Sequence, residues 1–111
     1  MPTEKDHALL QHLIDSTDTG SIKWETTAED YQFRTGFKGK YDVTVDKSYM
    51  PNGDEYYWMI LTDVEADREL VRISYAEANA VRELYLKAQR ASLNVDAVID
   101  EIIAFGNDIP F

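Results

Sequence analysis

The sequence predicts an α+β domain: an antiparallel five-strand meander with helices from both termini packed on one face (α-β-β-β-β-β-α-α). Apolar residues recur at helical spacing only near the two ends of the chain, whereas the middle holds short alternating runs separated by turn residues. Strands joined by hairpins are antiparallel, so helices at either end can cover one face of their sheet. With 111 residues, we expect a single compact domain, 1–111, ending in a short tail at 107–111.

The first element is a helix that begins near Thr3 and Asp6, two residues suited to helix starts. Its apolar positions fall on one side of the helix: Leu9, Leu10, Leu13 and Ile14. The polar run 15–19 followed by Gly20 has the composition of a turn and a helix end.

Five strands follow, which we expect at residues 22–25, 31–37, 41–46, 56–62 and 70–73. Lys38-Gly39-Lys40 predicts a tight turn, and Asn52-Gly53 is the strongest turn signal because glycine accepts a positive φ. The run 56–62 is apolar on both faces, which predicts a central strand.

Two further helices are expected at the C-terminal end. Ser74 and Glu77 have the spacing of a capping box. The helix that they begin has one apolar stripe: Val81, Leu84, Ala88 and Ala91. Asn94 begins the last helix and Gly106 ends it. The side of this helix that we expect to be buried consists of Val95, Val98, Ile99, Ile102 and Phe105.

The charge balance argues against direct binding to nucleic acid. Twenty-one acidic and eleven basic residues give a formal net charge of −10, and affinity for phosphate backbones comes from Lys and Arg. Four cations beside aromatic residues on the second and third strands are the exception, namely Arg34, Lys38, Lys40 and Lys47. The repulsion by the whole chain outweighs them, so we expect no nucleic-acid partner.

No catalytic or metal-binding constellation is visible in the sequence. Cysteine is absent, which excludes disulfides, thiol catalysis and Cys-based metal sites. His7 and His12 are spaced so that they point about 140° apart on a helix and cannot share a metal. We therefore expect a protein that is not an enzyme and has no cofactor.

The chain also has no visible targeting or membrane segment. Residues 1–7 lack the pattern of a signal peptide, and no apolar run approaches the roughly 20 residues of a membrane helix. We expect a cytoplasmic protein without a membrane partner.

An exposed sheet face is the principal candidate binding site. If alternate residues of the strand 56–62 face the helices, the residues between them project from the uncovered face: Tyr56, Trp58 and Ile60. Aromatic residues among polar neighbours such as Arg34 are typical of interfaces. The alternative is that a terminal segment, such as the tail 109–111, covers them.

Two other groups complete the predicted binding residues. An acidic turn contributes Asp63, Glu65, Asp67 and Glu69. A second candidate face, off the core side of the helix after Ser74, contains Tyr75, Arg82 and Leu86.

Several segments of the chain resemble small uncharacterised proteins of bacteria and their mobile elements. The segments are Leu9 to Ile14, Gly20-Ser21-Ile22-Lys23-Trp24-Glu25, Leu84-Tyr85, Ala88-Gln89-Arg90-Ala91 and 95–102. They are mainly core and cap positions, so the resemblance implies an α+β architecture and no activity, cofactor or site.

The function that we expect is that of a non-catalytic, acidic protein-binding module. It would act as a regulator, an immunity protein or an anti-defence inhibitor through the open sheet face and the acidic turn. One alternative is a DNA mimic that inhibits a nucleic-acid-binding protein. Another is a small-ligand domain or enzyme, with Glu25 and Asp30 near Trp24. A homodimer through the same sheet face is a further possibility.

Overall fold

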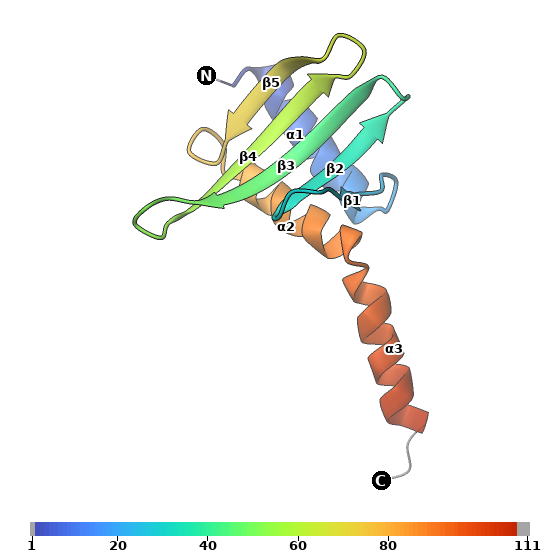
Figure 1. Ribbon diagram of the computed structural model, residues 1–111. Coiled ribbons are helices and arrows are strands. Elements are labelled where there is room, and N and C mark those ends of the chain that lie inside the picture. Colours follow the sequence, from blue (N-terminus) through green and yellow to red (C-terminus); the bar gives the residue numbers. More distant parts are fainter. Residues whose placement is uncertain (1, 109–111) are drawn as a thin grey trace.

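The computed structural model describes residues 2–108, with side chains to residue 105 (Figure 1). Its elements in chain order are α1 (Glu4–Asp18), β1 (Glu25–Thr26), β2 (Gln32–Phe37), β3 (Tyr41–Tyr49), β4 (Glu55–Asp63), β5 (Arg68–Ser74), α2 (Ala80–Ser92) and α3 (Val95–Asp108). The predicted α+β class and the order of elements are confirmed.

The five strands form one antiparallel sheet in the order β1-β2-β3-β4-β5. The turn after β2 places Lys38 and Gly39 at φ of +57° and +66°, conformations that glycine adopts readily. The β3–β4 turn places Gly53 at φ +91°. The composition of β4 predicts a central strand. In the sheet, β4 is an inner strand next to the edge strand β5, and β3 is the middle strand.

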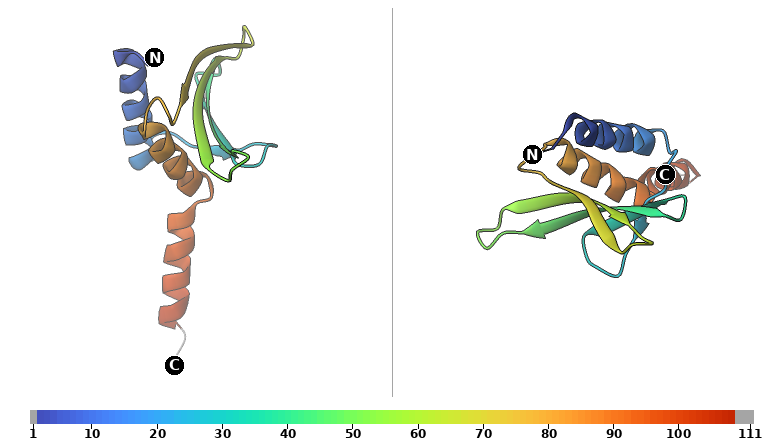
Figure 2. Two further views of the ribbon diagram at one scale, coloured as in Figure 1. Left: turned by 90° about the vertical axis from the view of Figure 1, so that its left-hand side faces the viewer. Right: turned by 90° about the horizontal axis from the view of Figure 1, so that it is seen from above.

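One face of the sheet forms the hydrophobic core. Alternate residues of β2 to β5 are buried on this face: Phe33, Val43, Val45, Tyr57, Met59 and Ile73. α2 lies directly on β2, β3 and β4, and α1 makes its main contacts with α2. Seen from above, α2 lies between α1 and the sheet (Figure 2). Both helices therefore cover the same face, as the sequence predicts.

Trp24 connects α1 to the first strand. Its indole N–H donates to Thr17 Oγ1 at 2.9 Å, and the Thr17 hydroxyl donates to the backbone carbonyl of Leu13 at 2.6 Å. A strand at 22–25 is expected, but β1 comprises only Glu25–Thr26 because Trp24 turns into the core.

The start of α2 differs from the expectation. Ser74 and Glu77 do interact, since the Ser74 amide and hydroxyl both donate to Glu77 Oε1 at 3.2 Å. However, this contact closes a turn after β5, and α2 begins only at Ala80. The predicted stripe is buried at Val81, Leu84 and Ala88, whereas Ala91 is exposed.

The expectation of a buried side on α3 is wrong. α3 projects away from the domain beyond the end of α2 (Figures 1 and 2). Its large apolar side chains are exposed, reaching 65% at Ile102 and 66% at Phe105. Asn94, at φ +53°, separates the two helices and redirects the chain. Gly106 does not end α3, which continues to Asp108.

None of the helices within residues 2–108 combines the length and the apolar character needed to cross a bilayer.

Two alanine substitutions should show by their effect on stability that the core is buried and that α3 is exposed. Leu84→Ala removes a fully buried side chain and should lower the free energy of unfolding by about 2–5 kcal/mol, because a cavity remains. Ile102→Ala should change it by less than about 0.5 kcal/mol, because Ile102 is exposed. Urea denaturation followed by far-UV circular dichroism measures both. Equal losses would contradict the position of α3.

Candidate protein-binding surface

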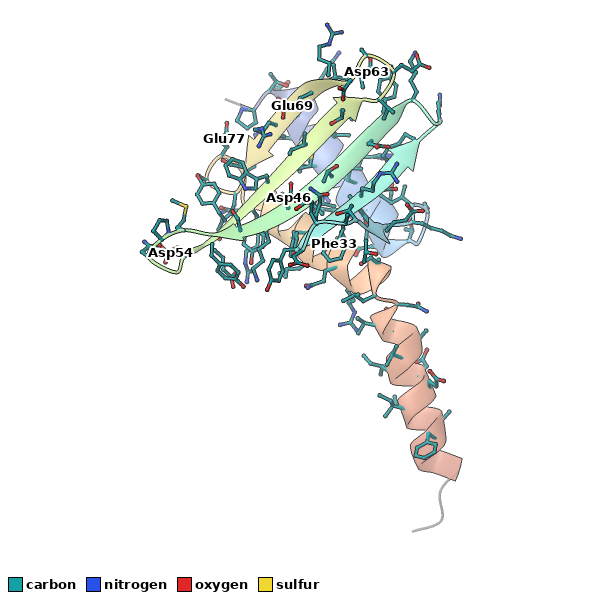
Figure 3. All side chains as sticks on the ribbon, in the orientation of Figure 1. Phe33, Asp46, Asp54, Asp63, Glu69 and Glu77 are labelled. Carbon is teal, nitrogen blue, oxygen red and sulfur yellow. The ribbon has the colours of Figure 1, made fainter. Side chains whose placement is uncertain are left out.

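The candidate site is the sheet face opposite the helices. Figure 3 looks onto this face, with Asp46 near its centre and the helices behind the sheet. The strand register aligns its residues in two cross-strand rows, Gln32-Asp46-Trp58-Ser74 and Arg34-Thr44-Ile60-Arg72. The condition set for β4 in the sequence analysis is met, since Tyr57 and Met59 are buried against the helices and Trp58 lies on the open face. The tail 109–111, proposed as an alternative cover, lies outside the described residues.

A cluster of four side chains forms the most distinctive part of this face. The rings of Tyr56 and Trp58 lie 4.8 Å apart between centroids, and the Arg72 guanidinium lies 5.4 Å from the Trp58 ring. Arg72 donates to both oxygens of Glu69, with its shortest bond at 2.7 Å. We call these four residues, Tyr56, Trp58, Glu69 and Arg72, the Trp58 patch.

A β-bulge makes the Trp58 patch possible. The register between β4 and β5 shifts at Leu61/Thr62, so that Thr62 pairs with Glu69 while Leu61 pairs with Val71. In a regular strand, residues 69 and 72 would point to opposite faces. The extra residue, Leu70, brings Glu69 and Arg72 to the same face.

Within the Trp58 patch, Arg72 and Glu69 form an ion pair. The hydrogen bond from Arg72 lowers the pKa of the Glu69 carboxyl. The same bond raises the pKa of Arg72. Both side chains are nearly half exposed, so solvent screens the pair and its main effect is to orient the guanidinium over the Trp58 ring.

Asp46 is a partly buried carboxylate beside Trp58. It is the register partner of Trp58, and Gln32 Nε2 donates to its Oδ1 at 2.8 Å. Gln32 is itself positioned by Thr27, whose hydroxyl donates to the amide oxygen at 2.7 Å. Burial raises the pKa of Asp46, and the Gln32 hydrogen bond opposes that change only in part.

Arg34 lies on the open face but is fully engaged. Its guanidinium donates to both oxygens of Asp42 at 3.2 and 2.9 Å, and to Glu25 at 3.1 Å. The hydrogen bond to Asp42 raises the pKa of Arg34. A bidentate pair holds the guanidinium rigidly, so Arg34 presents an ordered polar group in the same cross-strand row as Ile60, with Thr44 between them.

The predicted acidic turn lies apart from the Trp58 patch. Asp63 marks the β4–β5 end of the sheet in Figure 3 and its carboxylate accepts the amide of Ala66 at 3.1 Å. Asp63 follows Trp58 by five residues on the same strand, or about 17 Å at the usual strand rise. Glu65 and Asp67 lie in the turn itself, and Asp67 adopts φ +49°. Of the four predicted acids, only Glu69 belongs to the patch.

The second predicted face separates into two places. Tyr75 and Arg82 both contact Tyr57, with ring centroids 5.7 Å apart for the tyrosines and the guanidinium 5.8 Å from the ring. Leu86 instead lines a hollow beside the α2–α3 junction, with Leu93 and others. The structure therefore does not bring these three predicted residues together.

Sequence reasoning missed a polar cluster at the other end of β4. The Tyr57 hydroxyl donates to Glu55, and Lys47 Nζ lies 3.3 Å from the same carboxylate. Burial and the Glu55 hydrogen bond raise the pKa of Tyr57. A raised pKa keeps the phenol protonated, which suits a structural hydrogen bond better than general-base chemistry. Lys47 and Tyr57 are register partners on the same face of the sheet. The alternation along β3 and β4 is visible in the sequence, but the register that pairs these two residues is not.

The alternative pocket around Trp24 is not formed. Trp24 is buried in the core, Glu25 is exposed and bound to Arg34, and Asp30 does not line the hollow that contains Glu25. Among the described residues, no group of three or more metal-ligating side chains lies together. What the open face can do chemically is bury an apolar or aromatic side chain against Trp58 and satisfy polar neighbours at its edge.

Comparison with known proteins found no matching family model, no matching curated protein and no matching solved structure. The resemblance noted from the sequence stays a prediction.

The raised pKa of Asp46 predicts a specific dependence of stability on pH. An acid whose pKa rises on folding favours the folded state when protonated, so its contribution is present below about pH 3.9 and is lost as pH rises through the raised value. Asp46→Asn keeps an acceptor for Gln32 without the buried charge. The variant should therefore be more stable than the wild type at neutral pH and equal to it in acid.

Urea unfolding at acidic and at neutral pH measures this difference. Glu65→Gln is the control, because it removes one negative charge as Asp46→Asn does, but from an exposed position in the β4–β5 turn. If the stability difference between Asp46→Asn and the wild type is the same at every pH, then Asp46 does not have a raised pKa in the folded state.

Proposed function

We propose that the protein is a non-catalytic protein-binding module that uses the open sheet face, centred on the Trp58 patch. The observation that supports this most directly is an aromatic pair and an oriented guanidinium on a face that neither α1 nor α2 covers. Trp, Tyr and Arg are the residue types that contribute most to binding energy at protein interfaces. Here Trp58, Tyr56 and Arg72 lie in direct contact.

The surroundings of the patch support a protein partner in particular. The Gln32–Asp46 hydrogen bond borders it, since Asp46 is the register partner of Trp58, and the Arg34–Asp42 pair lies farther across the same face. Interfaces typically combine an apolar centre with a polar rim of this kind. The polar side chains of this face are already held by hydrogen bonds to one another, so they lose little rotamer freedom on binding.

The net charge of −10 also restricts the partner. A strongly acidic module attracts basic surfaces and associates faster with them at low salt. Inhibitors, immunity proteins and anti-defence factors bind another protein without reacting with it, and this is the role that we propose. The bacterial and mobile-element resemblance is consistent with that setting.

A second candidate function is mimicry of nucleic acid. It is favoured by the exposed acids Glu65 and Asp67 at the end of the sheet, for which no ion pair occurs among the described residues. In that case, the contact would rest on charge and lie away from the Trp58 patch.

Trp58→Ala should abolish partner binding while leaving the fold intact, because the side chain lies on the open face and is only partly buried. The tagged chain is used to capture partners from lysate of its source organism, with low-salt and high-salt washes and identification by mass spectrometry. Circular dichroism checks the fold of each variant. Val64→Ala is the matched control, since Val64 is exposed and lies in the β4–β5 turn.

The outcomes separate the two functions. A partner that survives high salt, is lost with Trp58→Ala and is kept with Val64→Ala supports the Trp58 patch. A nucleic-acid-binding partner lost at high salt, and also lost on Glu65→Gln with Asp67→Asn, supports mimicry instead. Unfolding of Trp58→Ala would place Trp58 in the core and remove the proposal.

A further inference from the structure

Asp46 is an acidic residue of the open sheet face without an ion pair in the described part of the chain. It lies near the centre of that face (Figure 3). Farther along β3, the Asp42 carboxylate pairs with Arg34. On β5, the Glu69 carboxylate pairs with Arg72. Asp46 therefore lies between two arginine–carboxylate pairs and has no cation of its own.

The hydrogen bonds of Asp46 leave one carboxylate oxygen free. Gln32 Nε2 donates to Oδ1 at 2.8 Å, whereas Oδ2 accepts no hydrogen bond from the described residues. Oδ2 is not enclosed, because the only buried side-chain nitrogen or oxygen without a partner among those residues is the Tyr85 hydroxyl. A donor from outside the chain can therefore reach Oδ2.

The groups around Asp46 compensate its negative charge only in part. Burial raises the pKa of its carboxyl, and the Gln32 hydrogen bond and the more distant charge of Arg72 lower it. Glu29, in the β1–β2 connection, adds a second negative charge that raises the pKa further. Arg72 is itself held by Glu69, to which it donates hydrogen bonds at both carboxylate oxygens. An additional positive charge near Asp46 would be stabilising.

Asp46 also lies beside the aromatic pair of the Trp58 patch. Trp58 is its register partner on β4, and directly opposite residues of antiparallel strands have Cβ atoms about 5 Å apart. The Tyr56 ring lies 4.8 Å from the Trp58 ring between centroids. Aromatic rings attract cations, and the Arg72 guanidinium already lies 5.4 Å from the Trp58 ring. A carboxylate next to two aromatic rings is a combination that recognises a cationic side chain.

A partner that covers Trp58 also covers Asp46, because the two residues are cross-strand neighbours. Removing a carboxylate from water is costly unless a cation or hydrogen-bond donors replace the water. The best partner is therefore one that places a positive group against Asp46 when it covers the aromatic pair.

A metal ion suits this position less well than a side chain does. Calcium and magnesium take about six or more oxygen ligands, and no group of three or more metal-ligating side chains lies together among the described residues. A second copy of the chain is also a poor source of the cation, because each copy carries a net charge of −10. A basic protein supplies the missing charge as lysine or arginine.

We propose that Asp46 and Trp58 form a subsite that accepts one lysine or arginine side chain of a partner protein. The charged group of that side chain binds Asp46 Oδ2, and its aliphatic carbons lie along the rings of Trp58 and Tyr56. This inference rests on the proposed function, since it names the chemistry that the open face recognises. It adds one directional contact to the general attraction between an acidic module and a basic partner.

A phage-displayed library of random peptides tests the subsite, with the full chain as bait at neutral pH. Peptides are kept if they bind the wild type and do not bind Trp58→Ala. We expect the kept peptides to contain an arginine or lysine whose replacement by methionine raises the dissociation constant about tenfold or more. Isothermal titration calorimetry with the synthetic peptides measures this change.

Asp46→Asn shows whether the peptide's cation acts through Asp46. On this variant, the parent peptide and its methionine form should have dissociation constants within about twofold of each other, because the carboxylate is gone. Asp46→Asn keeps an acceptor for Gln32, and circular dichroism checks its fold. Glu65→Gln is the control, because it removes one acid from the β4–β5 turn and should leave the tenfold difference unchanged.

The outcomes distinguish the subsite from the proposed function. Peptides that need Trp58 but bind Asp46→Asn as tightly as the wild type would overturn the subsite and leave the proposed function in place. An equal loss with Glu65→Gln would show only long-range attraction, which also contradicts the subsite. If no peptide depends on Trp58, or if Trp58→Ala unfolds, both the proposed function and the subsite are wrong.

Discussion

The packing of α2 on the sheet is the contact on which the rest of this structure depends. Val81, Leu84, Tyr85 and Ala88 are completely buried, and the Tyr85 ring packs against Phe33 and Tyr57 from two different strands. α2 is the helix that contacts β2, β3 and β4, and α1 is held mainly through α2. Without this layer, the period-two apolar face of the sheet would have no cover.

The central place of α2 also explains the two unusual features of the surface. A single helix directly on a five-strand sheet covers only part of it, and α1 is too far from the sheet to fill the remainder. An open groove lined by residues of α1 and the sheet is left on one side. At the other end of the domain α3 extends away from it (Figure 2). Both follow from one arrangement, in which the chain has more apolar helix than its own sheet can bury.

The two faces of the sheet therefore present different chemistry. On the helix side, the hollow that α2 leaves uncovered is lined mainly by apolar and aromatic side chains. On the open side, the Arg72–Glu69 pair lies beside the aromatic pair Tyr56–Trp58, and the Arg34–Asp42 pair lies farther across the same face, each holding its charges in fixed positions.

The sequence by itself determined the class of fold and the order of elements, because these depend on local periodicity and turn residues. The facing of β4 was decided by the tertiary structure, since residues 56–62 are apolar on both faces and only the packing of the helices buries Tyr57 and Met59. The sequence also identified Tyr56, Trp58 and Glu69 as surface residues. Only the tertiary structure decided that Arg72 joins them, since a bulge at Leu70 changes which residues share a face. Likewise, the apolar stripe on α3 predicts a buried side, whereas the structure leaves that side exposed. The direction of α3 depends on the conformation of Asn94 and on the space already occupied by α1 and α2, and these are properties of the assembled fold.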